Sequence, residues 1–260
     1  MKCLLIITCL LSSCLLLSAK EKVIHVFVAL CDNKTQGIQP VGEKIGNGDK
    51  PDANLYWGCS DGIQRYFTKV GLWKKLETHK PQAENAASPI LRRIIFQHKR
   101  TGSILIADAY QGSHMKACTT NYLNASYGSY KAIIDSKVLK RKIQAGANSN
   151  LTAFIGHNGL MDFAVEVTPA ETKPELDTIT LCCIADRYFI PHFQKTNTTP
   201  ILQTRSLMYP GSFILHDALE GWFKGESRSL IRTRAAKAYA KNQKISLKGG
   251  LSIFKNSEAN

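Results

Sequence analysis

The chain has 260 residues, of which 44% are hydrophobic and 21% are charged, and this is enough for one sizeable domain with a hydrophobic core. Its eight cysteines are too few for a disulfide scaffold, and its formal net charge of +14 permits contacts with anionic surfaces.

The first 19 residues have the pattern of a secretory signal peptide. Lys2 supplies the positive charge, residues 3–17 form a nearly unbroken apolar run, and small residues precede an expected cleavage site after Ala19. The apolar run is shorter than a transmembrane helix of about 20 residues. We therefore expect an exported protein, periplasmic or secreted, whose mature part is a single α/β domain over residues 20–260.

A second interpretation of this segment is a bacterial lipobox at residues 11–14, which would place a lipid anchor on Cys14. Apolar residues 15–17 follow this cysteine, whereas the first residues of a mature lipoprotein are usually polar. Simple export is therefore the favoured hypothesis, and the lipid anchor is the alternative.

Apolar runs that predict buried strands alternate along the chain with amphipathic patterns that predict helices. The run at 23–31 shows no period-two alternation, so both of its faces should be covered, and a Gly/Asp/Asn/Pro-rich loop follows at 32–53. Further strands are predicted at 92–98, 103–109, 151–156, 178–183 and 201–208. Helices are predicted at 54–70, 114–123, 130–145, 212–225 and 229–248. This order predicts an α/β fold with a mostly parallel central sheet flanked by helices on both faces.

Two of the predicted strands end in residues that can carry out chemistry. The strand at 151–156 is followed by His157, and the strand at 178–183 ends at Cys183. Ligands of open parallel sheets bind beyond the C-terminal ends of the strands. If these strands are neighbours, the imidazole meets the thiol at one sheet edge and can activate it as a nucleophile. Because adjacent strand residues point to opposite faces, Cys182 should pack in the core instead.

The number of cysteines supports a free thiol. Five cysteines remain after residues 1–19 are removed, and an odd number leaves at least one without an intramolecular partner. These five are Cys31, Cys59, Cys118, Cys182 and Cys183. We expect Cys183 to be the free one.

The segment 151–189, with FIGHNG followed by LCCIA, resembles the caspase-like cysteine peptidases, a clan that includes caspases, gingipains, legumains and separases. In that clan a strand ending in histidine precedes the strand ending in cysteine. The resemblance implies a caspase-like fold and a peptidase that acts on polypeptides without a cofactor or metal. It also implies that His157 is the general acid/base, that Cys183 is the nucleophile and that Gly159 contributes to the oxyanion hole.

Two positions depart from the pattern of this clan. Asn158 separates the histidine from the glycine, and Ile184 with Ala185 follows the cysteine where serine or glycine is common. Both departures bear on the oxyanion hole, so a divergent, inactive member is an open alternative.

The resemblance places the loops after the strands around the substrate. Asp49 lies in the first long loop, Asp162 follows His157 by five residues, and Arg205 lies in the strand after Cys183. Together with Gly159, these are the candidate substrate-binding residues. Which of them contacts a substrate side chain stays open.

Two further patterns carry less weight. Residues 58–62 match the G-x-S-x-G nucleophile elbow around Ser60, but this segment belongs to a predicted helix and lacks a preceding strand, so a chance match is preferred. His114 and Cys118 lie one helical turn apart, but no third ligand is near, so core packing is expected and no metal site is predicted.

Basic residues gather near the C-terminus. In a helix over 229–248 they share one face: Arg234, Lys237, Lys241, Lys244 and Lys248. Such a face is usually solvated, and it can also contact an anionic surface; a nucleic-acid partner is not predicted. Two hypotheses result: an exported cysteine peptidase, or a non-catalytic binding or structural protein of the cell envelope that uses this basic helix.

Overall fold

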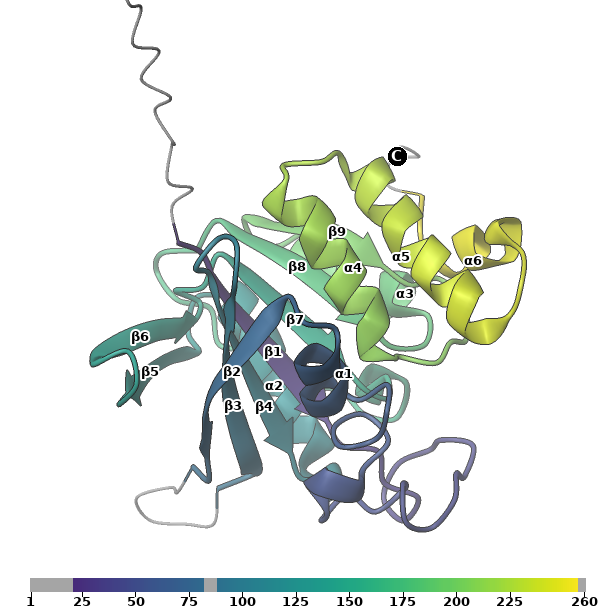
Figure 1. Ribbon diagram of the computed structural model, residues 1–260, viewed down its shortest axis with the longest axis horizontal. Helices are drawn as coiled ribbons and strands as arrows, with labels where there is room; N and C mark the ends of the chain where they lie inside the picture. The colour runs from purple at the N-terminus through teal and green to yellow at the C-terminus, as the bar shows by residue number, and fades with distance from the viewer. Residues whose placement is uncertain (1–20, 82–87, 257–260) are drawn as a thin grey trace, which may run out of the picture.

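The computed structural model describes residues 21–81 and 88–256 and shows an α/β fold (Figure 1). A seven-stranded sheet in the order β2-β3-β4-β1-β7-β8-β9 forms its centre. The strands are β1 (Val23–Ala29), β2 (Trp73–His79), β3 (Ile90–His98), β4 (Ile104–Tyr110), β7 (Leu151–Ile155), β8 (Leu176–Leu181) and β9 (Thr198–Gln203). The strands β4, β1, β7, β8 and β9 pair in parallel, whereas β3 is antiparallel to both of its neighbours. The predicted mostly parallel sheet is therefore confirmed.

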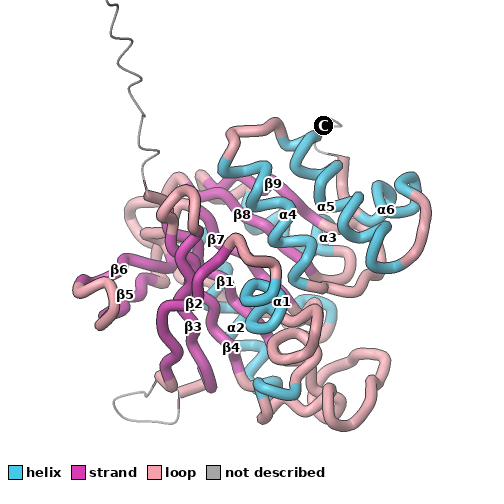
Figure 2. Tube along the Cα trace, viewed as in Figure 1, coloured by secondary structure: helices cyan, strands magenta, loops and turns pink. Residues whose placement is uncertain are grey.

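Helices cover both faces of this sheet, as predicted (Figures 1 and 2). On one face, α1 (Ile63–Lys69), α4 (Ser212–Phe223) and α5 (Arg228–Gln243) enclose the larger hydrophobic cluster. On the other face, α2 (Met115–Ser126) and α3 (Ala185–Phe193) enclose an aromatic cluster around Phe27 and Phe154. Because β1 is covered on both sides, its residues from Ile24 to Ala29 are all buried, which explains its lack of alternation.

The helix predicted at 130–145 is wrong, because this segment is a two-stranded hairpin of β5 (Lys131–Ser136) and β6 (Arg141–Gly146). Its buried apolar residues Ile134, Ile143 and Ala145 pack against isoleucines of β3 and β4. Within each strand, the buried residues follow the period-two alternation of a strand. In the sequence, the basic turn joins the two strands into one stretch that resembles a continuous helix.

The helix predicted at 54–70 begins only at Ile63. Asn54 does not cap it, because its side chain accepts a hydrogen bond from the Cys31 amide at 3.1 Å and donates to the Cys31 carbonyl at 2.8 Å. These bonds attach the turn at residues 55–62 to the chain just after β1. Ser60 lies exposed in that turn, and no strand directly precedes it.

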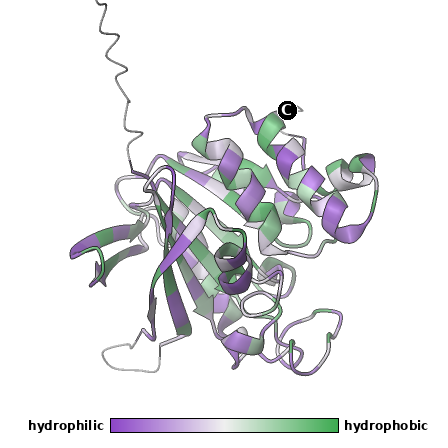
Figure 3. Cartoon of the chain, in the orientation of Figure 1, coloured by the Kyte–Doolittle hydropathy of each residue, from purple (hydrophilic) through white to green (hydrophobic). Residues whose placement is uncertain are grey.

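The basic helix predicted at 229–248 is two helices. Lys244 adopts left-handed backbone angles (φ 54°) at the end of α5, and Ser246 caps α6 (Leu247–Ile253). Hydropathy colouring shows hydrophilic and hydrophobic residues interspersed along these helices (Figure 3). Among the described residues, no helix has both the length and the hydropathy that a transmembrane span requires. The signal-peptide and lipobox predictions lie outside the described residues.

The strand order places a topological switch at the centre of the sheet. After β1 the chain builds β2, β3 and β4 on one side of it, and then crosses to form β7, β8 and β9 on the other side. Sheets of this kind bind ligands beyond the C-terminal ends of the strands at such a switch. Here that position lies beyond β1 and β7.

Candidate functional site

A cavity of about 340 Å³ lies at this switch point. It is lined by the long loop after β1, by the ends of β7 and β8, and by the segment that follows β9. This size falls in the lower part of the range that is usual for small ligand sites, about 300–1,000 Å³. The cavity lies where both the sheet topology and the predicted chemistry place a site.

Both residues of the predicted dyad line this cavity. The strands β7 and β8 pair in parallel with Ile155 opposite Leu181, so His157 and Cys183 each follow two residues beyond that pair. Gly156, directly before His157, lies so close to β1 that a Cβ atom there would approach the Cβ of Ala29 to 2.9 Å. A glycine is therefore required where β7 turns toward the cavity.

His157 is held by Asp162. Its Nε2 lies 2.7 Å from Oδ2 of Asp162, and the imidazole is 8% exposed while the carboxylate is 34% exposed. Because a carboxylate can only accept, Nε2 carries the hydrogen, and Nδ1 is the basic nitrogen of the neutral ring. No backbone amide of the described residues donates to this Nδ1. The ring therefore has a free acceptor beside the cavity.

Cys183 is partly exposed, and the backbone of Met208 holds its sulfur. The Met208 N–H donates to Sγ at 3.5 Å, and the thiol can donate to the Met208 carbonyl at 3.7 Å. Helix α3 begins two residues later, at Ala185. Ile184 adopts φ 50°, which is costly for a β-branched residue and typical of functional sites.

Asn158, which interrupted the expected His-Gly pair, connects the two strand ends. Its side-chain amide donates to the Cys183 carbonyl at 2.7 Å, while its Oδ1 accepts from the Leu160 amide at 3.2 Å. This fully buried side chain fixes the position of the cysteine relative to β7. The departure at Asn158 thus has a structural role in the site.

The amides that follow the cysteine are already used. The N–H groups of Ile184, Ala185 and Asp186 donate to Ser206 O, Thr204 Oγ1 and Thr204 O at 3.1, 3.2 and 2.8 Å. They are therefore not available to an oxyanion without rearrangement of the segment after β9.

The remaining predicted substrate-binding residues do not line the cavity. Asp49 accepts a hydrogen bond from Gln111 at 2.7 Å and lines a separate surface pocket. Arg205 is exposed, and its amide donates to the Ile253 carbonyl beside α6. Gly159 packs against the ring of Phe163. Asp162, in contrast, joins the site through His157.

All five cysteines of the described chain are free, but their environments differ. Burial raises the pKa of Cys31 to about 11 and raises the pKa values of Cys118 and Cys182 well above the ordinary value. Cys182 is fully buried among aromatic residues, whereas Cys183 lines the cavity, so the two adjacent thiols have the separate environments predicted for them.

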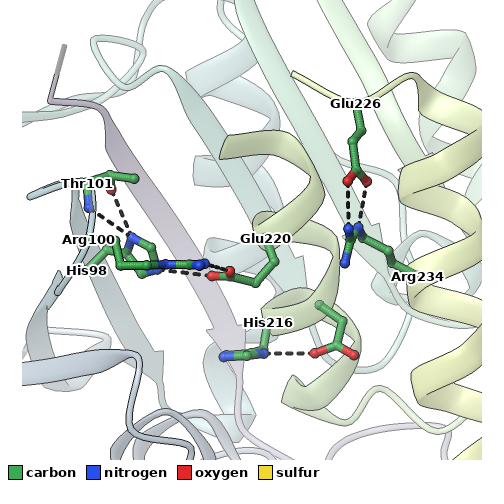
Figure 4. Close-up of polar contacts among 8 residues, drawn as sticks. His98, Arg100, Thr101, His216, Glu220, Glu226 and Arg234 are labelled. Atoms are coloured by element: carbon green, nitrogen blue, oxygen red, sulfur yellow. Dashed lines mark hydrogen bonds and ion pairs between the residues drawn. The ribbon is translucent and has the colours of Figure 1, made fainter. Parts of the chain in front are cut away.

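The basic C-terminal residues do not form one continuous row. Arg234 is paired with Glu226 through two bonds of 2.5 and 2.6 Å (Figure 4). Lys237 and Lys241 are exposed on α5, and Lys244 and Lys248 are exposed in and after the turn to α6. The described residues contain no group of three or more His, Cys, Asp or Glu side chains that could hold a metal ion, and His114 is exposed whereas Cys118 is buried.

The sequence analysis missed most of the cavity wall and the link between its strands. Tyr56 and Met208 line the cavity, and Asn158 connects its strands. Tyr56 was assigned to a helix stripe and Met208 to a strand end, so only Asn158 carried a signal, as an amide between two expected catalytic positions.

Comparison of the chain with known protein families, with characterised proteins and with solved structures found no match.

Proposed function

We propose that this protein is a cysteine hydrolase that acts on polypeptides, with Cys183 as nucleophile and His157 as general acid/base. One observation carries the proposal: the two side chains line the same cavity from register-matched ends of adjacent parallel strands, and the Nδ1 of His157 remains available as a base. The resemblance to caspase-like peptidases supports the same assignment. An exported protein is the setting that the N-terminal sequence favours.

The proposed reaction begins when a substrate carbonyl carbon approaches Sγ of Cys183. Nδ1 of His157 takes the thiol proton as the C–S bond forms, and the carbonyl electron pair moves to oxygen. When the tetrahedral intermediate collapses, the C–N bond breaks and Nδ1 returns the proton to the leaving amine. Water then attacks the thioester with the same base, releasing the acid and restoring the thiol.

Asp162 has the positioning role in this scheme. Its bond to Nε2 fixes the tautomer with a free Nδ1, and its negative charge stabilises the imidazolium that forms during each proton transfer. Met208 holds the sulfur at the cavity wall before reaction.

The test combines labelling with hydrolysis. Iodoacetamide at neutral pH should label Cys183 before the other thiols, because burial raises the pKa of Cys31, Cys59, Cys118 and Cys182. Cys183→Ala should lower hydrolysis of a denatured-protein substrate by at least about 10⁴-fold. Cys59→Ala, at the other partly exposed thiol, is the matched control and should retain activity. Equal activity in the two variants would exclude the proposal.

The alternative binding function has one supporting observation, the four exposed lysines on α5 and around its junction with α6. We propose it as the second candidate, an envelope-binding protein without catalysis. Binding of dextran sulfate that survives in a Cys183→Ala, His157→Ala double variant and is lost in a Lys237→Glu, Lys241→Glu variant would support it. Binding that is unchanged in the charge-reversed variant would exclude it.

A further inference from the structure

Most side chains that line the cavity beside Cys183 are apolar. They come from four separate segments of the chain: Ile38 and Val41, Tyr56, Met161 in the loop after β7, and Leu207 and Met208. The lining contains no Asp, Glu, Lys or Arg, and besides His157 and Cys183 its polar side chains are those of Gln39 and Tyr56. The chemistry of the wall is therefore that of a site for an uncharged, apolar group.

The charged residues predicted to bind substrate are either paired or outside the cavity lining. Asp162 is bonded to His157 at 2.7 Å, and Arg205 and Asp49 lie outside the lining. A charged substrate side chain entering this space would lose its hydration without gaining a partner. The structure thus provides discrimination against charged residues as well as attraction for apolar ones.

The mouth of the cavity extends the same surface. Leu207 is 69% exposed and Met161 is 41% exposed, and both belong to the lining. Large exposed apolar residues next to a concave apolar site are typical of ligand-binding surfaces. The other large exposed apolar residues of the described chain, such as Ile133 on β5 and Leu230 on α5, do not line the cavity.

We infer that this cavity selects a substrate residue with an apolar side chain, such as leucine or methionine, at the position whose carbonyl is attacked by Cys183. The inference rests on the proposed function, since it assigns the cavity to the acyl side of the bond that Cys183 cleaves. The side chain of that residue is the nearest to Sγ, because its carbonyl carbon must contact the sulfur. Flexible methionines and a leucine at the wall suit side chains of somewhat different shapes.

The experiment measures the alkylation of the full mature chain by peptidyl chloromethyl ketones that differ only in the residue next to the reactive group: leucine, aspartate or lysine. Alkylation forms a bond from Sγ to the methylene carbon, chloride leaves, and the thiol proton passes to His157. Mass spectrometry identifies the modified cysteine. We expect the leucine reagent to modify Cys183 with a second-order rate constant roughly 100-fold above those of the charged reagents.

A gain-of-function variant sharpens the test. Leu207→Lys adds a cation at the exposed mouth, so it should raise the rate with the aspartate reagent about tenfold and lower the rate with the lysine reagent. Leu230→Lys, a similarly exposed leucine on α5 that is 54% exposed, is the matched control and should change neither rate.

The outcomes separate the two proposals. If Cys183 is modified at equal rates by all three reagents, the apolar specificity is wrong while the nucleophile stands. If none of the reagents modifies Cys183 above the rate of free cysteine, both the proposed function and the specificity fail.

Discussion

Two histidine–carboxylate pairs lie at opposite ends of the strands of the same sheet, and their surroundings differ. His157 and Asp162 lie beyond β7, at the C-terminal edge, next to a cavity and a thiol. His98 and Glu220 lie at the other edge, where β3 ends and β4 begins (Figure 4). There the imidazole is fully buried and stacks on Phe223 with ring centroids 4.8 Å apart.

The second ring nitrogen distinguishes the two histidines. Nδ1 of His98 accepts from the Thr101 amide at 3.3 Å and also contacts the Thr101 hydroxyl at 2.9 Å. A third buried histidine, His25, resembles His98 in this respect, since the Gly146 amide donates to its Nδ1 at 3.1 Å. Only His157 of these three keeps Nδ1 free of a backbone donor within the described part of the chain. Pairing with a carboxylate therefore does not distinguish His157 from the other two, whereas its second nitrogen without a backbone donor, in a cavity that a thiol also lines, does.

Replacing each of the two histidines by alanine gives the largest expected difference in activity. His157→Ala should lower peptide hydrolysis by about 10⁴-fold, because the base for Cys183 is lost. His98→Ala should leave the activity per folded molecule unchanged and should lower the free energy of unfolding by about 2 kcal/mol, because polar partners are left buried. Hydrolysis assays and urea unfolding of both variants check this. Similar losses of activity in both would contradict the comparison.

Removing the carboxylate of the structural pair tests its role in packing. Glu220 bonds His98 and Arg100 and joins the β3–β4 turn to α4. Glu220→Ala should lower the free energy of unfolding by about 2 kcal/mol, since the His98 Nε2–H would lose its acceptor in a buried position. Glu226→Ala, at the more exposed pair with Arg234, is the control and should lower the free energy of unfolding less than Glu220→Ala does. Equal losses, measured by urea unfolding, would show that burial does not distinguish the pairs.

The sequence was sufficient to predict the architecture of the sheet but not all of its surroundings. Strands such as β1 and β7 are continuous apolar runs that only a covered parallel sheet accommodates, so their positions and the two strand-end residues His157 and Cys183 could be predicted. The hairpin at 131–146 could not, because its alternation depends on packing against β3 and β4. Met208 could not be placed at the cysteine either, since its contact joins segments 25 residues apart.

Removing the carboxylate of the candidate site should have a different signature. Asp162→Asn keeps the size of the side chain but removes the charge that stabilises a protonated His157, so kcat should fall by roughly 30-fold to 100-fold with little change in KM. Because Asp162 is 34% exposed, the free energy of unfolding should change by less than about 1 kcal/mol. Steady-state kinetics and urea unfolding check both parts. A large loss of stability with normal kcat would make Asp162 equivalent to Glu220.

The smallest effect concerns the pH dependence of stability at the structural pair. Burial lowers the pKa of His98 below its ordinary value, although the Glu220 carboxylate opposes this. The unfolded chain therefore takes up the proton first, so the stability contributed by neutral His98 is present above a pH of about 6.5 and is lost as the pH falls below it. Wild-type protein should lose more unfolding free energy between pH 7.5 and pH 5.5 than His98→Gln, because only the wild type carries the group whose pKa is lowered by folding. Urea unfolding at the two pH values measures this difference. An equal pH dependence in wild type and variant would mean that His98 has the same pKa in the folded and unfolded chain. Burial of this pair would then not change the pH dependence of the free energy of unfolding.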